Sequence, residues 1–247
     1  LISCSKIKNN EIFELTCGGL GLTGIILSAC LKLQKLKGNV VSRRIFPVRN
    51  LIESIENITK HRNQHDFVMS WIDMSNLFHN FGRGFVITGN IYQSEKSYSN
   101  IKYRKLTPNK IKKFRPKIFN KYSIRILNKL FYFKETYKKI PSDISLFESL
   151  YPFHNKGFYF DLYGNKGFIA HQVLIPEANI FEFIEKYETL VKDNNIPIIL
   201  SAFKAFKGKQ RFLNFNGNGF SMYTDFINNN NYINFIYKLN ILATEHG

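Results

Sequence analysis

The sequence predicts an α+β fold in which helices pack on one face of an antiparallel sheet. Some segments alternate apolar and polar residues with a period of two, which is typical of half-buried strands. Others place apolar residues three and four positions apart, which is typical of amphipathic helices. The last third of the chain has the order strand, helix, strand, strand, helix, and the first half begins in a similar way. This order favours an antiparallel sheet with helices on one face, and both halves are expected to form one continuous domain.

Four elements are expected between residues 39 and 92. The segment "NVVSRRIFPV" is predicted to be extended. The next segment, "RNLIESIENITKHR", predicts a helix, because its apolar residues recur at helical spacing. The alternation in "DFVMSWIDM" and the β-rich composition of "GRGFVITGNIY" each predict a strand. The apolar positions of the helix are Leu51, Ile52, Ile55 and Ile58.

The last third gives the strongest periodic signals. The segment "GFYFDLYGNKGFIAHQVLIP", residues 157–176, is interpreted as a strand, a turn at residues 164–167 and a second strand. Pro176 and Glu177 are expected to open a helix. Strands are then predicted in "IPIILSAFKAF" and "GFSMYTDFI", and a final helix is predicted to begin near Tyr232. The apolar stripe of the first of these helices is predicted to be Ile180, Phe181, Phe183, Ile184, Tyr187 and Val191.

Composition limits the classes of function. The chain has 247 residues, of which 44% are hydrophobic, so most of it is expected to be globular. The formal net charge of +17 favours an anionic partner such as nucleic acid, a membrane surface or a phosphorylated substrate, although an A/T-rich coding bias also produces lysine. The spacing of Cys4, Cys17 and Cys30 fits neither a metal site nor a disulfide framework. No metal site is expected, and neither a signal peptide nor a membrane-spanning segment is recognised.

A basic insertion is expected at about residues 94–140. Between Lys102 and Lys139 there are 14 lysines and arginines and a single acid, Glu135, and aromatic residues are interleaved among them. Such a composition is typical of a contact with an anionic membrane or with nucleic acid. A solvated insertion with drifted composition is the favoured interpretation. A peripheral membrane or polyprenyl-phosphate contact is favoured over nucleic acid.

The glycines of "LTCGGLGLTGIIL" have the spacing of a dinucleotide-binding turn, Gly19-x-Gly21-x-x-Gly24. The context does not fit a Rossmann fold, which needs a hydrophobic strand before the glycines, a helix after them and an acid about 20 residues further on. The preceding segment is mostly polar, and Arg43 and Arg44 stand where the acid belongs. Residues 27–34 alternate like a half-buried strand rather than a helix. The glycines still permit positive φ and close approach of a ligand to the backbone, or they form a simple turn between strands.

The longer stretch "NEIFELTCGGLGLTGIILSACLKL" resembles the end of the FAD-binding domain in FAD-linked oxidases of the vanillyl-alcohol-oxidase/p-cresol-methylhydroxylase superfamily. It is most similar to the decaprenylphosphoryl-β-D-ribose oxidase family. The resemblance implies that residues 1–37 are the carboxy-terminal edge of an FAD-binding domain and that residues 38–247 form the substrate-binding cap domain. It also implies that the residues that shape the turn and contact the flavin nucleotide are Gly18, Gly19, Gly21, Thr23, Gly24 and Ile26.

The same resemblance implies four pocket residues in the cap domain. Gln172, in "HQVLIP", and Lys204, in "SAFKAFKGK", match a pocket glutamine and lysine. Trp71 matches a pocket tryptophan, and Tyr223 replaces a cysteine near the flavin. Ala170 replaces a second pocket glutamine, so the substrate is expected to differ in detail. Each residue also has a simpler interpretation.

Those simpler interpretations are ordinary packing or solvation. A single tryptophan is more often part of a core than of a site, and Tyr223 could pack on neighbouring aromatic residues. Lys204 could face solvent. His61 and His65 have a zinc-like spacing, but neither a third ligand nor a general base accompanies them, so a solvated helix face is predicted.

The resemblance implies an FAD-dependent oxidoreductase, a dehydrogenase or oxidase acting on CH–OH groups, with a sugar or polyol such as a polyprenyl-phosphate pentose as substrate. Lys204 would then orient the substrate or balance its developing charge. The family's pyrophosphate-binding loops and its catalytic carboxy-terminal segment have no counterpart here, so the chain is expected to be a fragment that acts with further sequence. A partner reductase is a candidate partner. A cytoplasmic or peripheral membrane location is expected. The alternatives are an aldonolactone-type oxidase and a non-catalytic basic module.

Overall fold

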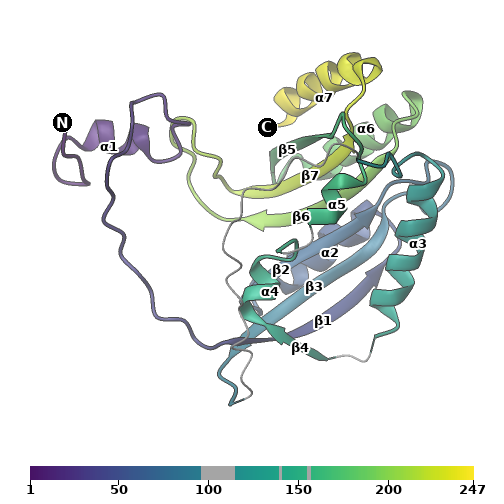
Figure 1. The fold of residues 1–247 in the computed structure, drawn as a ribbon, viewed down its shortest axis with the longest axis horizontal. Helices are drawn as coiled ribbons and strands as arrows, with labels where there is room; N and C mark the ends of the chain where they lie inside the picture. The colour runs from purple at the N-terminus through teal and green to yellow at the C-terminus, as the bar shows by residue number, and fades with distance from the viewer. Residues whose placement is uncertain (96–114, 139–140, 155–156) are drawn as a thin grey trace.

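The structure, a computed structural model, describes residues 1–95, 115–138, 141–154 and 157–247 (Figure 1). Within these residues, seven strands form one antiparallel sheet in the order β4-β1-β3-β2-β6-β7-β5. The α+β class with an antiparallel sheet is therefore confirmed. The strands are β1 (Val40–Val48), β2 (Phe67–Asp73), β3 (Arg83–Tyr92), β4 (Ser142–Ser145), β5 (Phe168–Pro176), β6 (Ile198–Phe206) and β7 (Gly219–Ile227).

The sheet is built from two parts that meet between β2 and β6. Strands β4, β1, β3 and β2 come from the first part of the chain, and β6, β7 and β5 come from the last third. At the seam, Met69 pairs with Lys204 and Ile72 pairs with Ser201. The buried Ser70 hydroxyl also accepts a hydrogen bond of 2.9 Å from the Phe203 backbone N–H. The two halves thus share one sheet, as their similar patterns predict.

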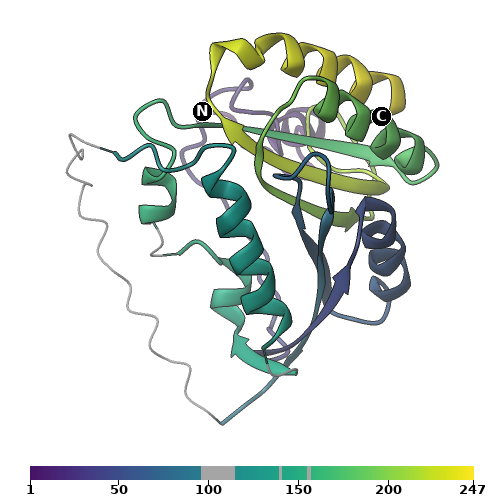
Figure 2. The same cartoon turned by 90° about the vertical axis from the view of Figure 1, so that its right-hand side faces the viewer.

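Three helices cover one face of this sheet: α2 (Leu51–His61), α6 (Ile180–Asp193) and α7 (Ile233–His246) (Figures 1 and 2). The helix α2 begins where the Asn50 side chain accepts a hydrogen bond from the Glu53 backbone N–H, which satisfies a donor of the first turn. The apolar stripes of α2, α6 and α7 pack against the apolar residues of the strands and form the main core. A 3₁₀ turn (Asn230–Tyr232) precedes α7, so the predicted final helix is confirmed.

The opposite face carries a partial helical layer that the sequence did not predict. Helix α3 (Ser123–Thr136) lies across β1 and β3, and α5 (Gly157–Asp161) lies near the other end of the sheet. The buried side chain of Asn128 fastens α3 by donating hydrogen bonds to the Asp73 carboxylate at 3.0 Å and to the Ile199 carbonyl at 3.2 Å. The short helix α4 (Leu146–Leu150) follows β4, and its cap is the Ser145 hydroxyl. Residues 96–114 of the basic insertion lie outside the described residues.

Three predictions of local structure are wrong. Residues 27–34 form no strand, because no other described strand lies beside them and their apolar side chains are exposed. Residues 157–161 form helix α5 instead of a strand. In α5 the aromatic residues of this segment pack together, with Phe119 and Tyr163 in T-shaped contact at 4.7 Å nearby. Phe181 is 43% exposed and is not part of the α6 stripe, whose other five residues are buried.

Residues 1–37 contribute helix α1 (Asn10–Thr16) and a long segment without regular structure that leads to β1. Figure 1 shows this segment leaving the sheet at β1 and returning to the loop between β6 and β7. There, Glu14 forms an ion pair with Arg211. The glycine segment that follows α1 is thereby held at the β6–β7 end of the sheet. Among the residues described, none of the helices combines the length and the apolar character that a membrane crossing requires.

Candidate functional site

Four predicted pocket residues lie on the same face of the sheet, the one opposite α2, α6 and α7. Trp71, Lys204, Tyr223 and Gln172 belong to β2, β6, β7 and β5, which are consecutive neighbours. Gln172 lies directly opposite Tyr223, which in turn lies opposite Ala202 on β6. Because side chains of directly opposed residues share a face, these strands present their predicted residues together. We call this β6–β7–β5 part of the sheet the open face.

The polar side chains of the open face have few internal partners. Lys204 is exposed and lies opposite Ser221 of β7, and none of the described ion pairs includes it. Gln172 donates a hydrogen bond of 2.9 Å to the Ser221 hydroxyl. Ala170, next to Gln172 on the same face, leaves no side chain to fill the space that a larger residue would occupy. The open face therefore brings together the Lys204 amine of β6, the Ser221 hydroxyl of β7 and the Gln172 amide of β5.

Trp71 is separated from the open face by its packing. Its ring stacks on Phe85 at 5.2 Å and meets Phe131 of α3 edge-on at 5.0 Å, which leaves the residue 9% exposed. It belongs to a small core cluster between α3 and the sheet. The structure thus places Trp71 beside the candidate site, at the border where α3 ends the open face.

Sequence reasoning missed Asp225, which lies two residues after Tyr223 on the same face of β7. It is 1% exposed, and its Oδ1 atom has no hydrogen-bond partner. Burial raises the pKa of this carboxyl to about 6, although the Tyr223 hydroxyl within hydrogen-bonding reach acts in the opposite direction. A buried carboxyl with one unpaired oxygen is costly and is a frequent mark of a functional site. An acid within an otherwise apolar, aromatic strand was the available signal.

Two further tyrosines stand near Asp225. The hydroxyls of Tyr159 and Tyr163 lie 3.3 Å apart, and burial raises the pKa of Tyr159 to about 12. Burial also raises the pKa values of Tyr163 and Tyr223, and the negative charge of Asp225 adds to both shifts. All three phenols therefore stay protonated at neutral pH, so they can donate hydrogen bonds. Asp225, with a pKa raised to about 6, changes its protonation state close to neutral pH.

The glycine segment has the geometry of an exposed, ligand-accessible turn. Gly18, Gly21 and Gly24 have φ values of +78°, +77° and +131°, a region that side chains rarely adopt. A Cβ atom at Gly21 or Gly24 would meet no atom within 4 Å, so the backbone is open to close approach there. The hydroxyls of Thr16 and Thr23 are 2.8 Å apart and link the two sides of the turn.

These features fit a turn that holds part of a cofactor such as FAD, because backbone amides next to positive-φ glycines form anion-binding concavities. Gly19 has a different role, since a Cβ atom there would lie 1.9 Å from the Leu15 carbonyl at the end of α1. Thr23 and Ile26 are exposed, as residues that contact a ligand need to be.

The β6–β7 loop brings the turn toward the open face. Gly18 packs on Asn214 of this loop, where an added Cβ atom would approach the Asn214 Cβ to 2.7 Å. The loop is fixed in turn to the strands, because Phe215 meets Phe206 at the end of β6 at 5.8 Å. Lys204 lies two residues before Phe206. The turn therefore lies beyond the Lys204 end of β6, whereas Gln172 and Tyr223 pair in the middle of β5 and β7. Asp225 lies two residues from the opposite end of β7.

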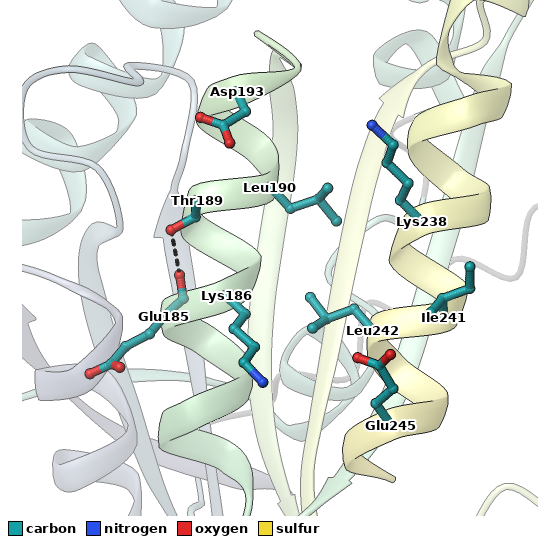
Figure 3. Close-up of a pocket in the computed structure, with 9 residues that line it drawn as sticks. All are labelled: Glu185, Lys186, Thr189, Leu190, Asp193, Lys238, Ile241, Leu242 and Glu245. Carbon is teal, nitrogen blue, oxygen red and sulfur yellow. Dashed lines mark hydrogen bonds between the residues drawn. The ribbon is translucent and has the colours of Figure 1, made fainter.

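A groove of about 480 Å³ lies on the other side of the sheet, between α6 and α7 (Figure 3). Figure 3 shows Leu190 and Leu242 pointing toward each other between the helices, with the charged side chains of Lys186, Lys238 and Glu245 around them. None of the sequence-predicted site residues lines it. We therefore place the candidate site on the open face.

The described residues contain no group of three or more side chains suited to a metal ion. His61 stacks on Phe46 at 4.5 Å and lies 5.5 Å from His65, and no acid or cysteine completes a ligand set with them. Burial and the neighbouring His65 lower the pKa of His61. No family model matches the sequence, and no curated protein shows significant similarity to it.

Proposed function

We propose that the chain forms the substrate-binding part of an FAD-dependent oxidoreductase that oxidises a sugar or polyol hydroxyl. The observation that carries the proposal is the open face, which places Lys204, Gln172, Tyr223 and Asp225 on one side of the sheet, with the exposed glycine turn beyond the Lys204 end of β6. The combination offers separate groups for binding an anion, for holding hydroxyls and for accepting a proton.

Lys204 and Gln172 would bind the substrate. The lysine amine is an exposed cation suited to a phosphate or to negative charge that develops on the substrate oxygen. Gln172 is oriented by its hydrogen bond to Ser221, which leaves its carbonyl oxygen free to accept from a sugar hydroxyl. These two side chains favour a phosphorylated polyhydroxyl compound such as a polyprenyl-phosphate pentose.

Asp225 and Tyr223 would accept the proton of the hydroxyl that is oxidised. Oxidation of an alcohol releases a hydride from carbon and a proton from oxygen, so the site needs an acceptor for each. Asp225, whose pKa is raised to about 6, is ionised at neutral pH and receives a proton through the Tyr223 hydroxyl. FAD held against the glycine turn would supply the acceptor for the hydride.

The test is the flavin content of the complete reading frame that encodes this chain. The purified protein is expected to be yellow, with absorption bands near about 370 and 450 nm, and to bleach when a polyprenyl-phosphate pentose is added without another acceptor. Lys204→Gln is expected to keep the flavin bands and to weaken bleaching, while Lys238→Gln on α7 leaves both unchanged. A folded but colourless protein contradicts the proposal.

A further inference from the structure

Helix α3 has two opposite surfaces, of which only one packs on the sheet. Its inner surface contributes the buried residues Ile124, Asn128 and Glu135. Figure 2 shows α3 running along the outside of the strands. The outer surface carries an apolar stripe at successive spacings of four, four, three and four residues, so that its members lie on one side of the helix. The stripe residues are Tyr122, Ile126, Leu130, Phe133 and Tyr137.

This outer stripe is exposed along its whole length. The exposed fractions of its residues range from 38% for Phe133 to 81% for Tyr137. Exposed apolar residues that occur singly need no explanation, but a continuous row on a helix marks a surface for a partner or a membrane. Before the start of α3, the Ile118 backbone N–H donates a hydrogen bond to the Leu162 carbonyl just after α5, a helix whose Phe158 is also exposed.

The charges beside the stripe are all positive. Lys121, Lys129 and Lys134 are exposed, and none of the described ion pairs includes them. The single acid of α3, Glu135, is buried and is already paired with Arg43 and Lys138. A helix with aromatic and aliphatic residues outward and lysines at the borders matches the boundary between lipid headgroups and acyl chains, where lysine stems also cover apolar surface.

A second helix provides an internal comparison. Helix α7 also has an exposed apolar row, formed by Ile233, Tyr237 and Ile241. Only Lys238 is close to this row, and Glu245 lies one turn beyond Ile241. The α7 row thus has the apolar component without the excess positive charge. The difference in charge, rather than the exposure of apolar residues, identifies the partner of α3.

We propose that the outer stripe of α3 docks this protein onto an anionic lipid surface, with the apolar side chains at the acyl boundary and Lys129 and Lys134 at the headgroups. This surface is independent of the oxidation proposed above. It is compatible with a lipid-linked substrate, but its test requires neither flavin nor turnover.

The experiment is co-sedimentation of the 247-residue chain with vesicles of phosphatidylcholine, alone or with roughly 30% phosphatidylglycerol. Binding is expected only to the anionic vesicles and is expected to weaken between about 0.05 M and 0.5 M salt. The variant I126S/L130S/F133S is expected to bind at least about tenfold more weakly. The variant K129Q/K134Q is expected to lose roughly fivefold per lysine at low salt. Circular dichroism checks that both variants fold.

The matched control is I233S/Y237S/I241S on α7, which is expected to bind like the unmodified chain. Equal binding to neutral and anionic vesicles overturns the proposal, as does an equal loss in the α3 and α7 serine variants. Concentration-dependent self-association that the α3 variant abolishes, without vesicle binding, would assign the stripe to a second copy of the chain instead. Tight, salt-sensitive binding to single-stranded RNA that only K129Q/K134Q weakens would assign the lysines to nucleic acid.

Discussion

The two faces of the sheet are built from the same strands but differ in the side chains that they carry. The face under α2, α6 and α7 is apolar, and its core residues have essentially no exposed surface. The open face places the exposed Lys204 on β6, the exposed Gln172 on β5 and the buried Asp225, with its unpaired Oδ1 atom, on β7. Since the strand period of two sends alternate residues to opposite faces, one strand such as β7 can supply both core and site. Stability and chemistry can therefore be perturbed separately.

The largest effect is expected from Phe183→Ala in α6. Phe183 is fully buried between α6 and the sheet, and truncation of such a ring leaves a cavity that costs about 3–5 kcal/mol of the free energy of unfolding. Urea denaturation measures this loss. Phe181→Ala, on the same helix but 43% exposed, is the control and is expected to change the free energy by less than about 0.5 kcal/mol. Equal losses would contradict the assignment of the core to the inner side of α6.

The second effect concerns Asp225 and depends on pH. Its folded pKa of about 6 exceeds the ordinary aspartate value of 3.8, so the folded state holds the proton more tightly than the unfolded state. The contribution of Asp225 is therefore most favourable below about pH 4 and is lost as pH rises through 6, by up to about 3 kcal/mol. Asp225→Asn removes this pH-dependent loss of stability, because asparagine does not ionise. The variant is expected to gain stability relative to the unmodified chain between pH 4 and pH 7.5.

Urea denaturation at both pH values provides the measurement for Asp225. Asp193→Asn, at an exposed position on α6, is the matched control and is expected to leave the pH dependence unchanged. If Asp225→Asn has the same pH dependence as the unmodified chain, Asp225 is not a raised-pKa carboxyl. The proton-accepting role proposed for it would then be lost.

The third prediction concerns the hydrogen bonds that hold α3 on the sheet. Asn128→Ala removes the amide that bridges Asp73 and the Ile199 carbonyl and leaves buried acceptors with fewer donors, which costs about 1–3 kcal/mol. Amide hydrogen exchange is expected to show faster exchange in α3 than in α6. Uniform acceleration over the whole sheet would show instead that α3 and the sheet unfold as one unit.

The smallest effect on stability is expected from Lys204→Ala and Gln172→Ala. Both side chains are exposed on the open face, so each substitution is expected to change the free energy of unfolding by about 0.5 kcal/mol or less. Thermal denaturation checks this. A loss as large as that of Asn128→Ala would mean that these side chains serve packing, and the open face would then resemble the core face.

Most strands and helices could be predicted from the sequence. The predictions failed in segments whose residue pattern is compatible with more than one conformation. The strands β1, β2, β3, β6 and β7 lie where extended or β-rich segments were predicted. The core residues of α2 and α6 recur at helical spacing, so their burial follows from the pattern. Residues 157–161 are aromatic in a way that suits either a strand or a short helix, and only packing on Phe119 and Tyr163 decides. Residues 27–34 alternate like a strand, but a strand forms only beside a partner.

The candidate site shows a similar division. Gln172, Lys204 and Tyr223 were predicted from the family resemblance, and their shared face follows from the strand pairing, which the sequence alone does not give. The importance of Asp225 depends on its burial and its unpaired oxygen, which only three-dimensional packing creates. The exposed stripe of α3 was not predicted, because the segment was assessed by its high content of lysine and arginine and no helix was predicted in it.

The pairing of β2 with β6 also has a consequence for the order of folding. Each half of the sheet contains pairs between strands close in sequence, such as β2 with β3 and β6 with β7, whereas the hydrogen bond between Ser70 and Phe203 closes a separation of 133 residues. Closing a long loop loses more chain entropy than closing a short one, so contacts of this kind form late. We expect two partly formed sheets to appear first and to join at β2 and β6. That final step would set the rate at which the two faces become distinct.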